Sequence, residues 1–276
     1  MAKQRLDVLL VERGFCKTRQ LAQRVIRAGE VQVNHQVMDK PGTAIADDAE
    51  ITVKQKQPYV SRGGEKLAKA LQTFAISVEG RICLDGGIST GGFTDCLLQT
   101  GARQVYGIDV GYGQVAWKLR QDTRVILRER TNLRYLKPED LYDEGAELPE
   151  LGVMDVSFIS LKKVLPAFWQ LLVAPREAVL LAKPQFEVGK EKVGKNGVVR
   201  SAHDQAEAIW QVLITARELG WGDRGLTYSP LVGPAGNIEY LLWLQMPEAA
   251  ITDMNTLTRE QIQQLTEQAQ SDLAHA

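Results

Sequence analysis

A short apolar run that ends in an acidic residue and leads into a glycine-rich turn constrains the fold of this 276-residue chain most strongly. Residues 81–85 have the character of a short buried strand, and Gly86, Gly87, Gly91 and Gly92 follow directly. Glycines let backbone amide groups approach a ligand closely where a strand turns into a helix. The sequence therefore predicts a strand, a ligand-binding turn and a helix in succession.

Short apolar runs and helical segments alternate along the rest of the chain. The last two runs are separated by Val-Gly-Pro-Ala-Gly-Asn, which leaves no room for a crossover helix, so they should pair antiparallel. The alternation favours a doubly wound, Rossmann-like α/β sheet whose last strand is reversed. The expected elements are a helix at about 65–75 and strands near 81–85, 105–109, 151–155, 178–183, 225–231 and 238–244.

The N-terminal region has a different pattern, with two small helices before short strands. Residues 5–13 are amphipathic and are closed by Gly14, and Thr18 is a suitable N-cap for a second helix that Gly29 ends. The residues expected to face the core on this second helix, at i, i+4 and i+7, are Leu21, Val25 and Ala28.

Short strands are expected at residues 30–34, where apolar and polar side chains alternate, and at 44–54, after the turn signal Pro41-Gly42. Together with the two helices they make a small α+β domain. A segment with Pro58 and two glycines then breaks the pattern. We divide the chain into a first domain (1–57), a linker (58–64), a main domain (65–246) and an acidic tail (247–276).

The net charge of −1 conceals an uneven distribution along the chain. Residues 1–30 hold seven Lys and Arg against three Asp and Glu, whereas residues 247–276 hold one basic and five acidic side chains. The tail is rich in Thr and Gln, has helical propensity and is expected to be peripheral. The basic region suits a nucleic-acid partner, and a solvated helix face is the alternative.

The same region resembles a known module. Arg-Leu-Asp-x-Leu-Leu, followed by Thr-Arg-x-x-Ala-x-x-x-Ile-x-x-Gly-x-Val-x-Val-Asn, resembles the ribosomal-protein S-four-type RNA-binding domain over about residues 5–56. Such modules grip structured RNA through the second helix and the turn after it, and Lys and Arg contacts to phosphate supply affinity without reading sequence. The candidate RNA-binding residues are Arg5, Lys17, Arg19, Arg24, Arg27, Asn34 and Arg62.

Two acidic residues at the ends of the first two strands of the main domain suggest a cofactor site. Asp85 is placed to hold a cationic amino-acid head group, and Asp109 to bind a ribose diol. An N-cap for Asp85 and a strand-ending turn for Asp109 are the alternatives. Asn132 is a candidate contact to the adenine or ribose side, or a plain turn residue. The other candidate cofactor-binding residues are Gly87, Ser89, Thr90, Gly91, Gly92 and Phe93.

Five motifs together resemble the TlyA-type family, whose catalytic domain is similar to FtsJ/RrmJ-type ribose methyltransferases. They are Ser-Arg-Gly-Gly-Glu-Lys-Leu, Leu-Asp-Gly-Gly-Ile-Ser-Thr-Gly-Gly-Phe-Thr-Asp, Met-Asp-Val-Ser-Phe-Ile-Ser-Leu, Lys-Pro-Gln-Phe-Glu and Gly-Asn-Ile-Glu-Tyr. The resemblance covers all of the chain except the tail. It implies S-adenosylmethionine as cofactor, ribosomal RNA or ribosomal subunits as partner, and methylation of a ribose 2′-hydroxyl, with cytidine as the nucleoside. No metal is implied.

The Lys-Asp-Lys-Glu set that this resemblance implies falls on Lys66, Asp155, Lys183 and Glu239. By the resemblance, Lys183 is the base or final proton acceptor, Asp155 orients it and the methyl donor, and Lys66 and Glu239 position the ribose. The residues alone agree in part, because Asp155 and Lys183 end predicted strands, where open α/β sheets bind ligands. Lys69 competes with Lys66 one helical turn away, and a surface ion pair is the alternative for Lys66 and Glu239.

Several classes of site and location are not indicated. Three cysteines without Cys-x-x-Cys spacing and three isolated histidines predict neither a disulfide framework nor a metal site. The charged N-terminus lacks a signal-peptide pattern, and no apolar stretch approaches the ~20 residues of a membrane span, so we expect a cytoplasmic protein that does not engage the membrane. No protein partner is predicted. Residues 189–199, rich in Lys and Gly, suit a mobile substrate loop or a solvated one.

Three other functions are weighed against an RNA methyltransferase. Relatives of this family have been labelled haemolysins, but a membrane-lytic role has no export signal or spanning segment to support it. An RNA-binding protein with an inactive methyltransferase domain would look the same at this level, although all four chemical positions are occupied. A nicotinamide oxidoreductase would need Gly-x-Gly-x-x-Gly, whereas the turn reads Gly87-x-Ser89-x-Gly91-Gly92.

Overall fold

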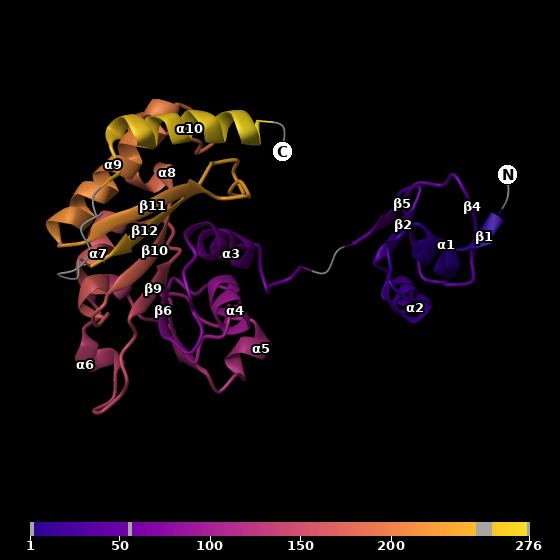
Figure 1. The fold of residues 1–276 in the computed structure, drawn as a ribbon, viewed down its shortest axis with the longest axis horizontal. Coiled ribbons are helices and arrows are strands. Elements are labelled where there is room, and N and C mark those ends of the chain that lie inside the picture. The colour runs from indigo at the N-terminus through magenta and orange to yellow at the C-terminus, as the bar shows by residue number, and fades with distance from the viewer. Residues whose placement is uncertain (1–2, 55–56, 247–255, 275–276) are drawn as a thin grey trace. The chain divides into compact units, whose positions relative to one another are not determined.

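The computed structural model describes residues 3–54, 57–246 and 256–274, and the chain divides into two units, Met1–Gln57 and Pro58–Ala276. Figure 1 shows both as ribbons. The boundary after Gln57 lies where the first domain was predicted to end. The segment predicted as a linker belongs to the second unit, since α3 (Gly63–Phe74) begins within it.

The first unit is built from two short helices and five short strands. Strand β1 pairs antiparallel with β4, and β2 lies between β3 and β5 in a separate antiparallel sheet. Leu6, Leu10 and Ile26 are fully buried in the core between these elements. The elements are β1 (Lys3–Arg5), α1 (Leu6–Glu12), α2 (Arg19–Arg27), β2 (Val31–Val33), β3 (Gln36–Met38), β4 (Ala44–Ala46) and β5 (Ile51–Val53).

The buried face of α2 corrects one sequence prediction. Thr18 caps the helix as expected, by accepting a hydrogen bond from the amide of Leu21. Ala22 and Ile26 are fully buried, however, while Leu21 and Val25 are only partly buried and Ala28 is exposed. The predicted stripe was therefore wrong by one position: the helix buries Ala22 and Ile26, which are also spaced i, i+4, and Leu21 and Val25 pack at the margin of the core.

The strand expected at residues 44–54 is also wrong as a single element. The chain turns between β4 and β5, where the amide of Ala49 donates to the carbonyl of Ala46 at 3.0 Å. The guanidinium of Arg13 donates to the carbonyls of Asp47 and Ala49 and so stabilises this turn. Two acidic residues in succession, Asp47 and Asp48, are more typical of a turn than of a strand interior.

The second unit contains a seven-stranded sheet in the order β11-β12-β10-β9-β6-β7-β8. All paired neighbours are parallel except those of β12, which is antiparallel to both β10 and β11. The predicted Rossmann-like sheet with a reversed last strand is confirmed. The reversed strand is inserted beside the edge strand β11. The strands are β6 (Ile82–Gly86), β7 (Gln104–Ile108), β8 (Val125–Arg128), β9 (Leu151–Met154), β10 (Glu177–Ala182), β11 (Gly222–Tyr228) and β12 (Tyr240–Gln245).

Helices cover both faces of the sheet (Figure 1). Helix α3 packs on one face with α4 (Gly92–Gln99) and α5 (Trp117–Arg120), around Leu67, Leu97 and Leu119. The opposite face is covered by α7 (Leu161–Gln170), α9 (Ala202–Glu218) and α10 (Arg259–Leu273). The remaining short helices are α6 (Pro138–Leu141), α8 (Pro184–Glu187), η1 (Leu133–Tyr135) and η2 (Lys190–Lys192).

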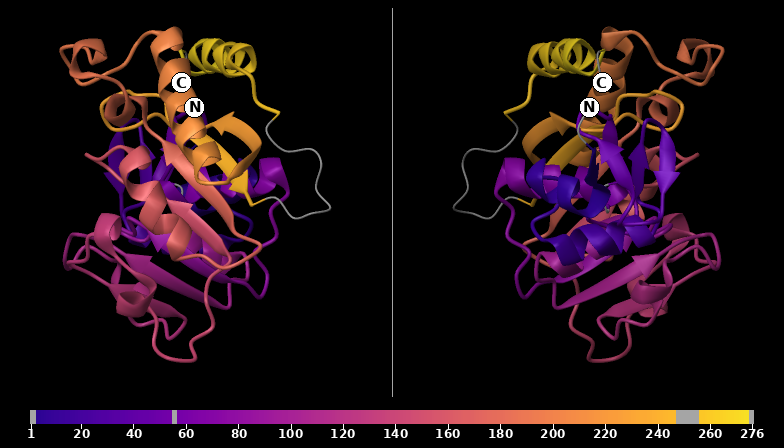
Figure 2. Two further views of the ribbon diagram at one scale, coloured as in Figure 1. Left: turned by 90° about the vertical axis from the view of Figure 1, so that its left-hand side faces the viewer. Right: turned by 90° about the vertical axis from the view of Figure 1, so that its right-hand side faces the viewer.

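The prediction of a peripheral tail is wrong for the part that forms α10. This helix lies beside α9, as Figure 2 shows, and it buries Ile262, Thr266 and Ala269. The hydroxyl of Thr266 donates to the carbonyl of Ala202 at 3.0 Å. Composition hid the pattern, because the three buried positions follow i, i+4, i+7 among polar residues. Residues 247–255 and 275–276 of the predicted tail lie outside the described residues.

Candidate active site

The carboxyl edge of the sheet gathers the residues predicted to carry the chemistry. Asp155 follows β9 and Lys183 follows β10, so both lie at the same edge. In the β10–β12 ladder Ala182 pairs with Tyr240. Lys183 and Glu239, the next residues on the two strands, therefore lie next to each other. The reversed direction of β12 is what brings its first residues to the edge where the parallel strands end.

Lys66 and Glu239 form a buried ion pair. The Nζ of Lys66 lies 2.5 Å from Oε2 of Glu239, and their side chains are only 10% and 3% exposed. The alternative of a surface pair is therefore wrong. Lys69, the competing lysine on α3, instead lies with its Nζ 4.2 Å above the ring of Tyr228. The structure thus selects Lys66 as the lysine that faces the edge of the sheet.

Lys183 is held by two groups on the turn after β9. Its Nζ lies 2.6 Å from Oδ1 of Asp155, as an ion pair whose angle is not that of a hydrogen bond. The same Nζ donates a hydrogen bond to the hydroxyl of Ser157 at 2.9 Å. The Lys183 side chain is 10% exposed, and that of Asp155 is 23% exposed.

A cavity of about 490 Å³ is lined by Asp155 and Ser157, the two partners of Lys183, whereas Lys183, Lys66 and Glu239 are not among its lining residues. Of the predicted cofactor-binding residues, Gly87, Ser89, Asp109 and Asn132 line it, together with the catalytic candidate Asp155. Asp109 is fixed by backbone amides, since Oδ2 accepts from Ser89 at 2.8 Å and Oδ1 from Gly111 at 2.7 Å. The side chain of Asn132 accepts from the amide of Arg134 and so starts η1. Both residues therefore act as turn formers at the cavity wall.

The glycine-rich turn is shaped by close packing as well as by the cavity. Gly87 has a φ of +89°, and a Cβ there would lie 2.5 Å from the carbonyl oxygen of Asp155. The rest of the predicted loop is not brought to the cavity wall. Gly92 packs against the Ser61 hydroxyl, and Phe93 is buried in the core. The predicted cofactor-binding residues of this loop that do not line the cavity are Thr90, Gly91, Gly92 and Phe93.

Asp85 is fully buried and does not line the cavity. Its Oδ2 accepts a hydrogen bond from the Thr94 hydroxyl at 2.6 Å, and its Oδ1 has no hydrogen-bond partner among the described residues. Burial raises the pKa of this carboxyl to about 7. The N-cap alternative is not observed, because α4 is capped by Gly91 without a side-chain bond. The predicted contact of Asp85 to a ligand therefore remains a proposal.

We expect Asp85→Asn to stabilise the protein without ligand at pH 8 by about 4 kcal/mol and to have little effect near pH 4. Burial raises the pKa of the folded carboxyl from 3.8 to about 7, so the unfolded chain releases this proton first as pH rises. Stability of the parent protein is then lost between these two values, and the amide avoids the loss. Urea unfolding at both pH values measures the difference. Equal stabilisation at pH 4 and pH 8 would contradict the assignment to this carboxyl.

Comparison with known families now identifies the fold. The FtsJ-like methyltransferase model matches residues 59–246, which contain the whole seven-stranded sheet, and the S4 domain model matches residues 4–51. The chain belongs to the FtsJ-like methyltransferase family. It is 48% identical to the Bacillus subtilis protein YqxC over 98% of this chain and 95% of that protein.

Two further relatives support the membership of this methyltransferase in the TlyA-type branch. It is 49% identical to a Mycobacterium tuberculosis protein named 16S/23S rRNA (cytidine-2′-O)-methyltransferase TlyA, over 87% of this chain and 89% of that protein. A solved structure from Streptococcus thermophilus is 44% identical, with a TM-score of 0.74, and the match covers 100% of this chain and 98% of that chain. The similarity therefore spans both units.

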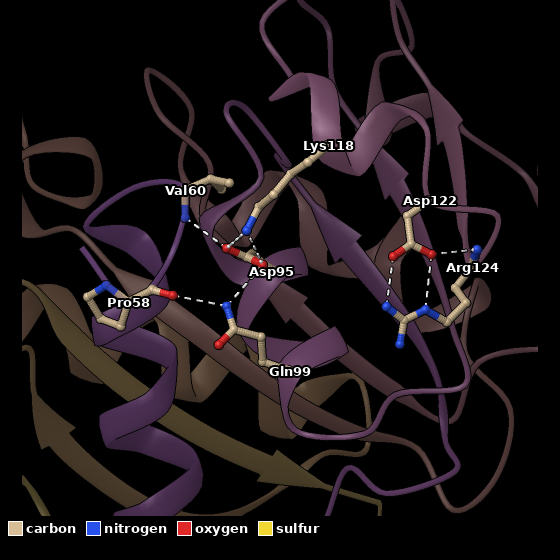
Figure 3. A network of polar contacts seen from close by, with 7 residues as sticks. All are labelled: Pro58, Val60, Asp95, Gln99, Lys118, Asp122 and Arg124. Carbon is tan, nitrogen blue, oxygen red and sulfur yellow. Dashed lines mark hydrogen bonds and ion pairs between the residues drawn. The ribbon is translucent and has the colours of Figure 1, made fainter. Parts of the chain in front are cut away.

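In this methyltransferase the first residues of the second unit are anchored to α4 by a network around Asp95 (Figure 3). Oδ2 of Asp95 accepts from the amide of Val60 at 2.8 Å, and the Lys118 ammonium lies 2.9 Å from the same carboxylate. Gln99 donates to the carbonyl of Pro58 at 3.0 Å. The segment predicted as a linker is thus ordered by side chains of the helix that follows the glycine-rich turn.

The predicted RNA-binding residues of the S4 unit divide into two groups. Arg5 and Arg19 are half exposed and form ion pairs with buried Asp7, each at 3.0 Å. The hydrogen bond from Arg5 is the largest of the effects that hold the pKa of Asp7 well below its usual range. The second group is exposed to solvent and forms no ion pair among the described residues. Its members are Lys17, Arg24 and Arg27.

The last two predicted RNA-binding residues have different surroundings. Asn34 has a φ of +48° in the β2–β3 turn, and its side chain accepts from the amide of Glu50 at 3.0 Å. It therefore shapes the turn. Arg62 is exposed and precedes α3 in the second unit.

The predicted loop 189–199 is fixed at its end, because Asn237 accepts from the amide of Val199 and donates to the carbonyl of Gly197.

The sequence reasoning missed residues on the turn after β9 and in α8. Ser157 contacts Lys183 and lines the cavity, and Phe158 beside it is 92% exposed with a φ of +65°. The ring of Phe158 lies 5.3 Å from that of Phe186. Glu187 accepts from the Ser160 hydroxyl at 2.5 Å. All of them stand within the motifs Met-Asp-Val-Ser-Phe-Ile-Ser and Lys-Pro-Gln-Phe-Glu, but spacing alone assigns them no partner.

Proposed function

We propose that this chain transfers a methyl group from S-adenosylmethionine to a ribose 2′-hydroxyl of ribosomal RNA, with cytidine as the modified nucleoside. The observation that carries the proposal is the position of Lys183, held between Asp155 and Ser157 beside a cavity at the carboxyl edge of the sheet. A buried amine next to a ligand-sized cavity suits proton transfer from a bound hydroxyl.

The residues around the cavity fit S-adenosylmethionine. Its volume of about 490 Å³ suits a nucleoside-sized ligand, and Asp109 provides a carboxylate for a ribose diol. The absence of a side chain at Gly87, which lines the cavity, lets the glycine-rich turn pack against the backbone of Asp155. Gly87, Ser89, Asp109 and Asn132 would therefore hold the cofactor. S-adenosylmethionine supplies an electrophilic methyl group when it is bound.

The four charged residues have distinct tasks in this proposal. A ribose hydroxyl is a poor nucleophile and must lose its proton as the new carbon–oxygen bond forms. Lys183 receives that proton at Nζ, and Asp155 stabilises the resulting ammonium from 2.6 Å. The pair of Lys66 and Glu239, adjacent to Lys183 across the β10–β12 ladder, positions the ribose. Correct placement of the hydroxyl supplies a large part of the rate.

Ribosomal RNA, free or within ribosomal subunits, is the proposed substrate. The S4 domain match and the exposed Lys17, Arg24 and Arg27 support RNA binding, and the M. tuberculosis relative is named for activity on both 16S and 23S rRNA. We propose that residues 1–57 bind RNA and that 65–246 form the catalytic domain, joined by 58–64. Because ribosomes lie in the cytoplasm, we place the protein there. Among the described residues no helix is long and apolar enough to span a membrane.

The proposal is tested by methyl incorporation from labelled S-adenosylmethionine into purified small and large ribosomal subunits and into naked 16S and 23S rRNA. Digestion to nucleosides and mass spectrometry should identify 2′-O-methylcytidine. A methylated base without ribose methylation would overturn the assignment of the hydroxyl. Binding of rRNA without any transfer would favour an RNA-binding protein with an inactive methyltransferase domain.

We expect Arg24→Ala combined with Arg27→Ala to weaken rRNA binding and to lower the slope of log affinity against log salt by about two. Each arginine is exposed on α2, so each is available to displace one counterion from a phosphate. Fluorescence anisotropy of a labelled rRNA fragment at several salt concentrations measures the slope. The control is Arg103→Ala with Arg124→Ala, which removes equal charge from the second unit. An equal loss in both variants would contradict a specific role for α2.

A further inference from the structure

We infer that Ser157 is a positioning residue that fixes the direction of the Lys183 amine, an inference that rests on the proposed function. The hydroxyl of Ser157 accepts a hydrogen bond from Lys183 Nζ at 2.9 Å. Lys183 itself is 10% exposed, whereas Ser157 is exposed and lines the cavity. Ser157 therefore contacts the buried amine and also lines the cavity.

The geometry separates the tasks of the two partners of Lys183. Asp155 lies close, at 2.6 Å, but its contact is an ion pair without hydrogen-bond geometry. Ser157 supplies a directional hydrogen bond. Charge attraction depends weakly on angle, whereas a hydrogen bond weakens steeply away from linearity. Asp155 thus balances the charge of the ammonium, while Ser157 determines where the nitrogen points.

The distinction matters most for the form of lysine that accepts a proton. A neutral amine carries two N–H bonds and one lone pair in a tetrahedral arrangement. Its attraction to the Asp155 carboxylate is much reduced because its charge is gone. The hydrogen bond to Ser157 can still be made, and it fixes one N–H. With that bond in place the lone pair is confined to the remaining directions, and in this proposal the ribose hydroxyl of the substrate is bound along one of them.

The turn after β9 explains why Ser157 reaches Lys183. Asp155 is tied to the end of β6, since its amide donates to the carbonyl of Gly86 at 3.0 Å. Three residues later, Phe158 takes a φ of +65°, and the chain bends there. Ser160 then caps α7 through a hydrogen bond to the amide of Lys162. Both ends of the turn are anchored, and Ser157 projects from its middle.

The test compares the full-length protein with Ser157→Ala and Ser157→Thr in steady-state methyl transfer to ribosomal subunits. Ser157→Ala should lower kcat by about tenfold, the effect of one hydrogen bond, and leave KM for RNA and the affinity for S-adenosylhomocysteine unchanged. Ser157→Thr keeps the hydroxyl and should restore most of kcat. The matched control is Ser160→Ala, which removes a hydroxyl from the same turn that contacts Glu187 and not Lys183. It should lower thermal stability and keep kcat.

Each outcome decides between the inference and the function on which it rests. A parent protein that transfers no methyl group overturns the proposed function. If the parent is active and Ser157→Ala has the same kcat, or if Ser157→Thr is as slow as Ser157→Ala, the positioning role is wrong while the function stands. An increase in KM for RNA at constant kcat would likewise overturn it, because that pattern belongs to a substrate contact.

Discussion

Replacing Lys183 by Met should lower methyl transfer by at least about 10³-fold while the fold is retained. The substitution removes the proposed acceptor of the hydroxyl proton, and it leaves Asp155 without the ammonium that it pairs with. Met is close to Lys in length and is apolar, so it fills the 10% exposed site. The Asp155 side chain is 23% exposed, but its Oδ1 is buried and loses its ion-pair partner, so we also expect a measurable loss of stability.

Lys183→Arg makes the experiment sharper. The guanidinium keeps the positive charge next to Asp155, but it does not deprotonate in proteins and cannot accept the proton. We expect it to be as inactive as Lys183→Met in single-turnover transfer to ribosomal subunits. Lys69→Met serves as the control, because that lysine lies over Tyr228 and should leave transfer unchanged. An active Lys183→Arg protein would show that the residue acts through its charge alone.

The sheet and its functional edge could be predicted because both depend on local patterns. Alternating apolar runs and helical segments locate the strands, and the carboxyl ends of parallel strands meet at one edge. Asp155 and Lys183 were therefore predictable from position alone. Lys66 was not, since it lies on a helix, and only the resemblance to a known family chose it over Lys69. Contact with Glu239 distinguishes the two lysines, and that contact spans 173 positions in sequence.

Other features of the site depend on tertiary packing, which composition does not reveal. Gly91 and Gly92 are predicted ligand contacts because they lack side chains, but a Cβ there would also meet Leu119 or Ser61, so close packing within the chain requires these glycines too. Asp85 ends its strand as predicted but faces inward to Thr94. The polar composition of α10 concealed its buried face. Ser157 was not predicted, because no sequence spacing indicates a hydroxyl that orients an amine. In each case the deciding neighbour lies elsewhere in the chain.

Glu239→Ala should destabilise the second unit by about 3–5 kcal/mol, because it leaves the Lys66 ammonium buried without its partner. The Lys66 side chain is 10% exposed, and Glu239 is the acidic group within ion-pair distance among the described residues. Urea unfolding followed by tryptophan fluorescence measures this unit alone, since all five tryptophans follow residue 58. Arg103 and Glu147 form an exposed pair, so Glu147→Ala should barely move the unfolding midpoint.

The double variant Lys66→Met with Glu239→Leu separates stability from function at this site. Removing both charges together abolishes the desolvation penalty of the single variants, and apolar side chains of similar volume pack in the same space. We expect stability near that of the parent protein, and methyl transfer reduced at least as far as in Glu239→Ala. Both single variants should be much less stable than the double variant. A Glu239→Ala protein as stable as the parent would contradict this expectation. In that case the Lys66 ammonium must reach water by moving out of its buried position, and the ion pair contributes little to the stability of the second unit.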